Sequence, residues 1–275
     1  MSQSSVLIAV VTKCRDTLPL TLLSISQQTY DNIYVKILMD RRHEFNDVME
    51  LSLSALEFNG MGYDIEYGKG RIESICEALS LKYDYIYIAD DDAFLEKDVI
   101  EKLVKFMEEH CEAGYVMPNV LYPGREVFPP WVRALLKVEL HRLSNMTKDE
   151  LQNFVRSVSP RYRDLVTCFK DKRLSDMVVE IYWGGNLSLL RRIAISKELI
   201  ANLSKWSDGA ECEDLYLTRQ IVLGGWKGYT LLGARVWHLW RGHSVEGAFS
   251  KLSEEDVDEI WLGRIPDKVK KVGLK

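Results

Sequence analysis

Segments with strand character and segments with helical periodicity alternate through residues 6–121, and this alternation limits the fold more than any other feature. Runs rich in Val, Ile and Tyr are typical of buried strands, and each is followed by apolar residues at helical spacing. Strands joined through helices pair in parallel. We therefore predict an α/β fold with a doubly wound, mixed and mostly parallel sheet. The expected strands are 6–11, 34–39, 63–67, 85–89 and 115–117, and the expected helices are 18–28, 45–56, 72–81 and 96–110.

Three consecutive acids, Asp90-Asp91-Asp92, end the apolar run Tyr85–Ala89. Ligands of open α/β sheets bind beyond the carboxyl ends of the strands. Asp90 and Asp92 leave an extended backbone on the same side, and such a pair of carboxylates can hold magnesium or manganese. The alternative is a solvated turn in which one Asp caps a helix starting near Lys97. A cap needs only one acid, so the pattern favours a metal site.

The composition is that of a globular enzyme with a substantial core. Of 275 residues, 47% are apolar and 28% charged, and the net charge of −5 argues against a nucleic-acid partner. No apolar run approaches the roughly 18 residues that span a bilayer. The five cysteines are scattered and odd in number, which favours reduced thiols. We therefore expect a cytoplasmic protein.

The alternation ends after Pro118, and we expect a helical insertion at residues 122–176. Prolines punctuate this segment, and it is basic within an acidic protein. Residues 127–142 include an amphipathic stretch with Arg133 and Lys137 on its rim. They could form an acceptor-binding flap, make a peripheral contact with anionic membrane lipids, or pack as a small helical subdomain, which we favour. The expected divisions are a donor-binding half at 1–121, the insertion at 122–176, an acceptor and catalytic half at 177–245, and a helical tail at 246–275.

Further candidate residues follow the insertion. After an expected strand at 177–182, Gly184-Gly185-Asn186 permits a tight turn and the close approach of another molecule. Glu213 and Asp214 open a helix, where its dipole favours acids, but the position also offers a general base. His238 ends a short strand between two tryptophans and is either a packed side chain or a ligand.

In this order, the segments resemble the inverting nucleotide-sugar glycosyltransferases of family 2, which have the GT-A fold. The resemblance covers about residues 6–238. Gln27-Gln28-Thr29-Tyr30 resembles the Gln-Thr-Tyr of that family, the three acids its Asp-x-Asp, and Glu213-Asp214 its Glu-Asp pair. Two departures stand out. Val11-Thr12-Lys13-Cys14 lacks the family's asparagine, and the second strand ends in one acid, which leaves the nucleotide base open.

The resemblance implies transfer of a sugar from a nucleotide-diphosphate donor to a glycan, lipid-linked or protein acceptor, with inversion and with Mn²⁺ or Mg²⁺ as cofactor. It implies that Asp214 is the catalytic base and that Asp90, Asp92 and His238 bind the metal. The implied donor contacts are Thr12, Asp40, Arg71, Asp90 and Asp91. The implied acceptor contacts are Trp183, Gly184, Gly185, Asn186 and Glu213. Arg71 and Lys69 either add positive charge beside the diphosphate or lie in a solvated loop.

Two other classes of function fit less well, namely another metal-dependent phosphoryl or nucleotidyl enzyme and a non-catalytic binding protein. A haloacid-type phosphatase needs Thr or Val shortly after its second aspartate, where this chain has Ala93-Phe94. A nucleotidyltransferase needs a glycine-rich loop after the first strand, and Lys13-Cys14-Arg15 offers none. A non-catalytic nucleotide-sugar binding protein of the same fold would not need the base at Asp214. The sugar, the nucleotide and the acceptor stay open.

Overall fold

The computed structural model describes the greater part of the chain. Trp183, the amphipathic residues 127–142, the side chain of Asp40 and most of the expected tail at 246–275 lie outside the described residues. The described residues are 3–40, 46–121, 145–158, 172–182, 184–207 and 213–239, together with Glu255, Glu259, Leu262, Arg264 and Ile265.

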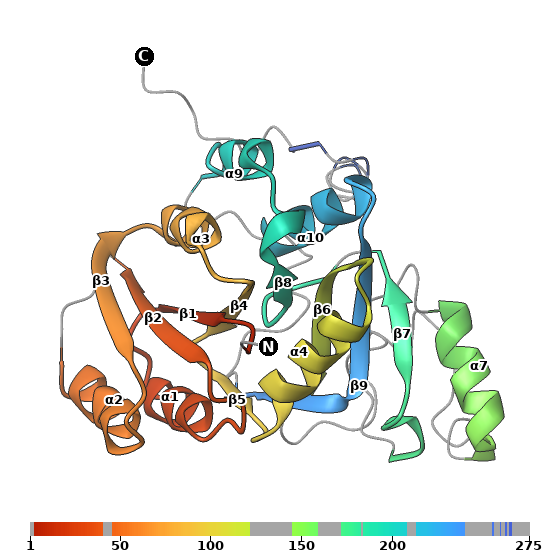
Figure 1. The fold of residues 1–275 in the computed structure, drawn as a ribbon, viewed down its shortest axis with the longest axis horizontal. Coiled ribbons are helices and arrows are strands. Elements are labelled where there is room, and N and C mark those ends of the chain that lie inside the picture. The colour runs from red at the N-terminus through yellow and green to blue at the C-terminus, as the bar shows by residue number, and fades with distance from the viewer. Residues whose placement is uncertain are drawn as a thin grey trace.

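The first half of the chain forms the predicted parallel strands, in the order β3-β2-β1-β4. These are β1 (Val6–Thr12), β2 (Ile33–Asp40), β3 (Tyr63–Lys69) and β4 (Tyr85–Asp90). The helices between them are α1 (Leu18–Ser26), α2 (Asp47–Phe58) and α3 (Arg71–Ser80). Figure 1 shows α1 and α2 on one side of these strands and α3 on the other. Because Val11 of β1 pairs with Asp90 of β4, both strands end at the same edge of the sheet.

The second half makes the sheet mixed. Strand β8 (Leu189–Arg191) lies antiparallel between β4 and β6 (Ala113–Leu121), and β6 pairs in parallel with β9 (Lys227–His238). Strand β9 also pairs antiparallel with β5 (Ala93–Leu95) and β7 (Val178–Ile181). The predicted mixed α/β sheet is confirmed. Strands β5 and β8 were not predicted, because three residues are too few to show a period.

The remaining helices cover this half of the sheet. Helix α4 (Val99–Glu109) buries its predicted apolar face, and α9 (Lys197–Leu203) and α10 (Glu213–Leu223) lie near α3 in Figure 1. Short 3₁₀ helices are η1 (Lys172–Leu174) and η2 (Arg192–Ala194). The acids at 90–92 do not cap α4, which begins only at Val99, so the solvated-turn interpretation of these acids is wrong.

The described part of the insertion is helical, as expected. Helix α7 (Lys148–Val158) begins with a capping box, in which the Thr147 N–H donates to Glu150 Oε2 at 2.8 Å and the Glu150 N–H donates to Thr147 Oγ1 at 3.3 Å. An ion pair of 2.8 Å between Lys148 and Asp176 joins α7 to the segment before β7. The described part of the insertion is therefore anchored at the β7 edge of the sheet.

The Gln28 side chain connects α1 to α4. Its amide donates to Ser24 O and Glu96 O, each at 3.0 Å, and its Oε1 accepts the Ile100 N–H at 3.1 Å. An N–H in the first turn of α4, which has no partner within the helix, is thereby satisfied. The segment that resembles the family's Gln-Thr-Tyr thus serves to fix α4 behind the three acids.

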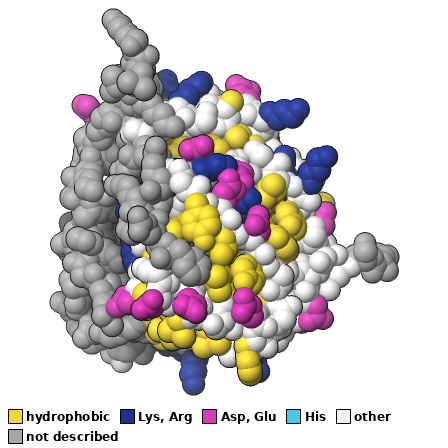
Figure 2. Space-filling view, turned by 90° about the vertical axis from the view of Figure 1, so that its left-hand side faces the viewer, with side chains coloured by type: hydrophobic (Ala, Val, Ile, Leu, Met, Phe, Trp, Pro, Cys, Tyr) yellow, Lys and Arg dark blue, Asp and Glu magenta, His cyan; other side chains and the backbone are white. Residues whose placement is uncertain are grey.

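Strand β3 is one edge of the sheet, and its outer face is shown in Figure 2. Acidic and basic side chains are interspersed there with hydrophobic ones. Lys36 on β2 and Lys69 on β3 pair with Glu66 of β3 and Glu77 of α3. Charged side chains of this kind discourage edge-to-edge pairing with another sheet. Lys69 is therefore held in an ion-pair cluster at the end of β3 and not in a solvated loop, while a role beside the diphosphate stays a prediction.

Within the described residues, no helix has both the length and the apolar character needed to span a membrane.

Candidate active site

The site forms where β4 ends and the chain turns into β5. Asp90 is the last residue of β4, and the short strand β5 begins at Ala93. Ala93 pairs with His238 in the β5–β9 register, which places the imidazole beside the three acids. Asp90 and His238, 148 positions apart in the sequence, thus lie side by side because a three-residue strand pairs with the end of β9.

Asp90, Asp92 and His238 form a cluster whose ligand-type atoms all lie within 4.8 Å of one another. His238 Nε2 lies 3.5 Å from Asp92 Oδ1 and 4.0 Å from Asp90 Oδ2. Asp92 is 2% exposed, and among the described residues its buried Oδ1 accepts no hydrogen bond. Such an atom is costly to leave unsatisfied, so it fits a cation ligand. The three predicted metal ligands are therefore adjacent and have the oxygen and nitrogen donors that a divalent cation requires.

Burial is the main influence on the acidity of Asp92. It raises the pKa of the carboxyl, as do the neighbouring Asp90 and Asp91 charges, whereas His238 and Arg15 act in the opposite direction. A charged carboxylate with so little solvent requires positive charge nearby. The cluster is thus set up to favour a cation.

Asp91 points away from the cluster and holds the β1–α1 loop. Its Oδ2 accepts hydrogen bonds from Thr12 Oγ1 at 2.8 Å and from the Lys13 N–H at 2.9 Å, and its Oδ1 lies 3.0 Å from Arg15 Nη1. Thr17 Oγ1 donates to its backbone oxygen. Thr12 and Asp91 were both predicted to contact the donor, but they are 1% and 3% exposed and bond to one another. Their observed contacts position the loop behind the site.

Arg71 joins the acidic turn to the start of α10. It is the first residue of α3, directly after the extended N-cap Gly70. Its Nε donates to Glu213 Oε1 at 2.6 Å and its Nη2 to Asp90 Oδ1 at 3.2 Å. Burial raises the pKa of Glu213, Arg71 opposes that rise, and Asp214 adds to it. Glu213 is 4% exposed and accepts a hydrogen bond from Arg71. The acceptor contact that the sequence predicted for Glu213 stays a prediction.

Asn186 contacts both the acidic turn and the predicted base. Its backbone N–H donates to Asp214 Oδ2 at 2.8 Å, and its Nδ2 lies 3.4 Å from Asp90 Oδ1. The next residue, Leu187, is buried with a φ of 70°, a strained conformation for a leucine. Strain of this kind is tolerated where surrounding contacts fix a functional turn. Here it directs Asn186 between the two carboxylates.

The paired glycines pack against the protein itself. A Cβ at Gly184 would lie 2.8 Å from Tyr115 Cε2, and the Gly184 N–H donates to Thr218 Oγ1 at 2.7 Å. The Gly185 N–H contacts the Met117 sulfur at 3.2 Å. The turn therefore packs closely against β6 and α10 of the same chain, and the predicted approach of another molecule stays a prediction. The acceptor contacts of this turn and of Trp183 stay predictions, as does the donor contact of Asp40.

Arg15 is the residue of the site that the sequence analysis did not identify. Arg15 lies in the loop after β1, and its Nη1 lies 2.9 Å from Asp92 Oδ2. The loop after β1 lies at the same edge of the sheet as the acids after β4, so a basic residue in that loop could have been predicted as part of the site.

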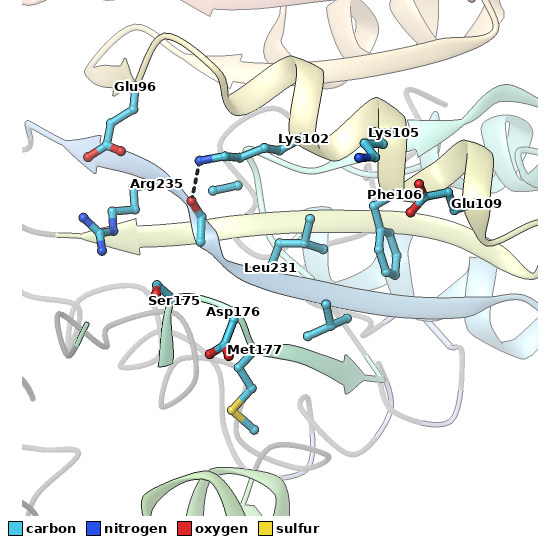
Figure 3. A pocket seen from close by; sticks show the side chains of 13 residues that line it. Glu96, Lys102, Lys105, Phe106, Glu109, Ser175, Asp176, Met177, Leu231 and Arg235 are labelled. Carbon is cyan, nitrogen blue, oxygen red and sulfur yellow. Dashed lines mark hydrogen bonds between the residues drawn. The ribbon is translucent and has the colours of Figure 1, made fainter. Parts of the chain in front are cut away.

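A cavity of about 560 Å³ lies apart from this cluster, between α4, β9 and the segment before β7 (Figure 3). Lys102 spans it and donates to Gly233 O at 2.9 Å. None of its lining residues belongs to the acidic cluster. Figure 3 shows its charged groups spread along the walls rather than converging on one point.

The mixed α/β sheet with acids at the end of β4 matches the GT-A fold that the resemblance predicted. Residues 73–169 match the model of Glycosyl transferase family 2. A search of curated proteins found no match. The matched residues make up about a third of the chain and include the three acids, so this part of the chain is similar to family 2 glycosyltransferases.

Crystal structures of S. aureus TarS share this fold. The TarS structure aligns with a TM-score of 0.55 at 13% identity, covering 94% of this chain and 43% of TarS. TarS 1-349 aligns with a TM-score of 0.54 at 12% identity, covering 94% of this chain and 69% of that one. The UDP complex of TarS 1-349 aligns with a TM-score of 0.53 at 11% identity, covering 94% of this chain and 70% of that one. This chain thus spans less than half the length of the TarS chain in the first of these structures.

Proposed function

We propose that this chain is a family 2 glycosyltransferase, which moves a sugar from a nucleoside-diphosphate donor to an acceptor hydroxyl with inversion, using a divalent cation and Asp214 as general base. The observation that carries the proposal is the double contact of Asn186, to Asp214 and to Asp90. It places a candidate base beside a candidate metal cluster, and this chemistry needs both. The UDP bound to TarS 1-349 supports a nucleotide donor.

The ligands of the cation would be Asp90, Asp92 and His238. The unbonded Oδ1 of Asp92 and the adjacent Nε2 of His238 support this assignment. Carboxylate oxygens suit Mg²⁺ and Mn²⁺, while imidazole suits the transition metals, so the set favours Mn²⁺. When bound, the cation would neutralise negative charge that develops on the leaving diphosphate.

Asp214 would accept the proton of the acceptor hydroxyl. The N–H groups of Asn186 and Leu215 each donate to one of its carboxylate oxygens at 2.8 Å, which fixes its orientation. An ionised carboxylate is an acceptor and can take up a proton. The acceptor oxygen attacks the anomeric carbon as the bond to the diphosphate breaks and its electron pair leaves with the diphosphate. One displacement from the opposite face inverts the configuration.

Glu213 and Arg71 would support this chemistry indirectly. Because Arg71 contacts both Glu213 and Asp90, we assign the pair to holding α10 against the acidic turn. Asp214 follows Glu213 in the first turn of α10, so the same contacts position the base.

The test is a thermal-shift panel of UDP, GDP, TDP and CMP, each with and without Mn²⁺, followed by nucleotide release from the matching nucleotide sugar. A ligand at a hundredfold excess over its Kd stabilises the folded state by about 2.7 kcal/mol. We expect one nucleoside diphosphate to raise Tm in a Mn²⁺-dependent manner and its sugar conjugate to be slowly hydrolysed. Binding without turnover would make the chain a nucleotide-sugar binding protein, and no shift with any nucleotide would contradict the donor proposal.

A further inference from the structure

Two arginines contact the acidic turn, and they differ in how many of their guanidinium nitrogens have no acceptor. Arg71 uses Nε and Nη2 on the buried Glu213 and on Asp90, and its side chain is 27% exposed. Arg15 uses only Nη1, which it shares between Asp91 and Asp92, and its side chain is 45% exposed. Among the described residues, the Nε and Nη2 of Arg15 have no hydrogen-bond acceptor. Arg15 is therefore the more exposed of the two arginines, and it keeps both Nε and Nη2 available to a ligand, whereas Arg71 keeps only Nη1.

The loop that carries Arg15 is fixed from both sides. The N–H groups of Lys13 and Cys14 bond to Asp91 Oδ2 and Thr12 Oγ1, and Cys14 adopts a φ of 54°. On the other side, the Arg15 carbonyl oxygen accepts a hydrogen bond from the Leu18 N–H at 3.0 Å. A non-glycine residue with positive φ costs free energy and persists where its surroundings enforce it. The loop thus holds Arg15 in one place before any ligand arrives.

Arg15 and His238 lie beside different oxygens of the Asp92 carboxylate. Asp92 Oδ2 lies 2.9 Å from Arg15 Nη1, and Asp92 Oδ1 lies 3.5 Å from His238 Nε2. A diphosphate held by a cation at the cluster would therefore lie within reach of the guanidinium. A planar guanidinium can bind phosphate oxygens through two parallel N–H groups.

We infer that Arg15 binds the diphosphate of the donor directly, as a second positive group beside the cation. This inference rests on the proposed function. In this role Arg15 holds Asp92 Oδ2 through Nη1 and directs Nε and Nη2 to the phosphate oxygens. It takes over the donor contact that the sequence analysis assigned to Arg71, whose observed partners are internal acids.

The experiment measures two affinities for wild type, Arg15→Gln and Arg15→Lys. Titration calorimetry gives the Kd of UDP with Mn²⁺ present, and electron paramagnetic resonance gives the Kd of Mn²⁺ alone. Arg15→Gln should weaken UDP binding about ten- to hundredfold, because charge-assisted hydrogen bonds to phosphate are lost. Its Mn²⁺ affinity should stay equal or increase, since Asp92 loses a competing cation. Arg15→Lys keeps the charge without the planar fork and should give an intermediate UDP affinity.

Lys13→Gln is the matched control, because it removes the same charge from the same loop. The Lys13 side chain is exposed, and only its backbone contacts Asp91. This variant should bind UDP within about twofold of wild type, since exposed charges are screened. If Arg15→Gln bound UDP as tightly as wild type, or lost UDP and Mn²⁺ affinity in parallel, Arg15 would act only through Asp92 and the inference would be wrong. Absence of UDP binding by wild type itself would overturn the donor proposal for UDP, and this inference with it.

Discussion

Arg71 Nε lies 2.6 Å from Glu213 Oε1, and this contact joins the first turn of α3 to the first turn of α10 across 142 residues of sequence. The Glu213 carboxylate is 4% exposed, so the protein excludes nearly all water that could otherwise solvate its charge. A carboxylate in such a place needs its partner. The stability of this corner of the fold and the position of Asp214 therefore depend on the same ion pair.

Arg71→Gln should lower the free energy of unfolding by about 3 kcal/mol, because it leaves Glu213 buried without a counter-charge. Adding Glu213→Gln removes the unpaired charge and should restore part of that loss. Urea denaturation of the two single variants and the double variant gives the coupling energy. Strictly additive effects would show that the contact contributes nothing.

The contacts of Arg71 illustrate what the sequence could and could not provide. Alternation of strands and helices predicted the parallel half of the sheet and placed Asp90 and Asp92 at the carboxyl end of a strand, whereas Asp214 was predicted from the start of a helix and from the resemblance. Periodicity says nothing about which polar groups at that edge bond to each other. The pairing of Arg71 with Glu213 and of Asp91 with Thr12 depends on side-chain directions that arise only when distant segments pack. Likewise, β5 is too short for a pattern, although it brings His238 to the acids.

Asp92→Asn tests the metal cluster. This substitution removes a charge that burial and the neighbouring acids disfavour, so Tm should stay level or increase. Mn²⁺ affinity should fall more than tenfold, because an amide oxygen is a weaker ligand than a carboxylate. Electron paramagnetic resonance of Mn²⁺ provides the measurement. Wild-type Mn²⁺ affinity in this variant would exclude Asp92 as a ligand.

Gly228→Ala tests the packing of β9 on β6. A Cβ at this position would overlap the ring of the fully buried Tyr115, whose hydroxyl donates to Ile181 O at 3.2 Å. We expect a loss of about 3 kcal/mol or more, since the ring has no space to move into. Gly62→Ala is the control, because its Cβ would make an ordinary contact of 3.5 Å with Tyr34. Similar unfolding free energies for the two variants would contradict this packing.

The cluster at the β3 edge predicts a specific acid response. Hydrogen bonding with Glu77, followed by that with Lys36 and Lys69, lowers the pKa of Glu66 from 4.5 to about 2. Because the folded-state pKa is depressed, the contribution is complete above pH 4.5 and is lost as pH falls toward 2. The side chain is 25% exposed, so solvent screening reduces the effect to about 1 kcal/mol.

Glu66→Gln should therefore be less stable than wild type at pH 7, and the difference should shrink between pH 5 and pH 2.5. Chemical denaturation of both proteins at several pH values checks this. A difference that does not change with pH would show that the Glu66 charge is not stabilised in the fold.

Asp214→Asn tests the central claim most directly, because a base is needed only if an acceptor hydroxyl loses its proton. Asparagine keeps the size of the side chain and an oxygen for the Asn186 N–H, but it cannot accept the proton. With the donor found in the nucleotide panel, the measurement is Mn²⁺-dependent turnover of the nucleotide sugar, alongside nucleotide affinity. We predict that turnover falls by a factor of about a hundred to ten thousand while nucleotide and Mn²⁺ affinities stay close to wild type. Turnover near the wild-type rate would contradict the assignment of Asp214 as the base.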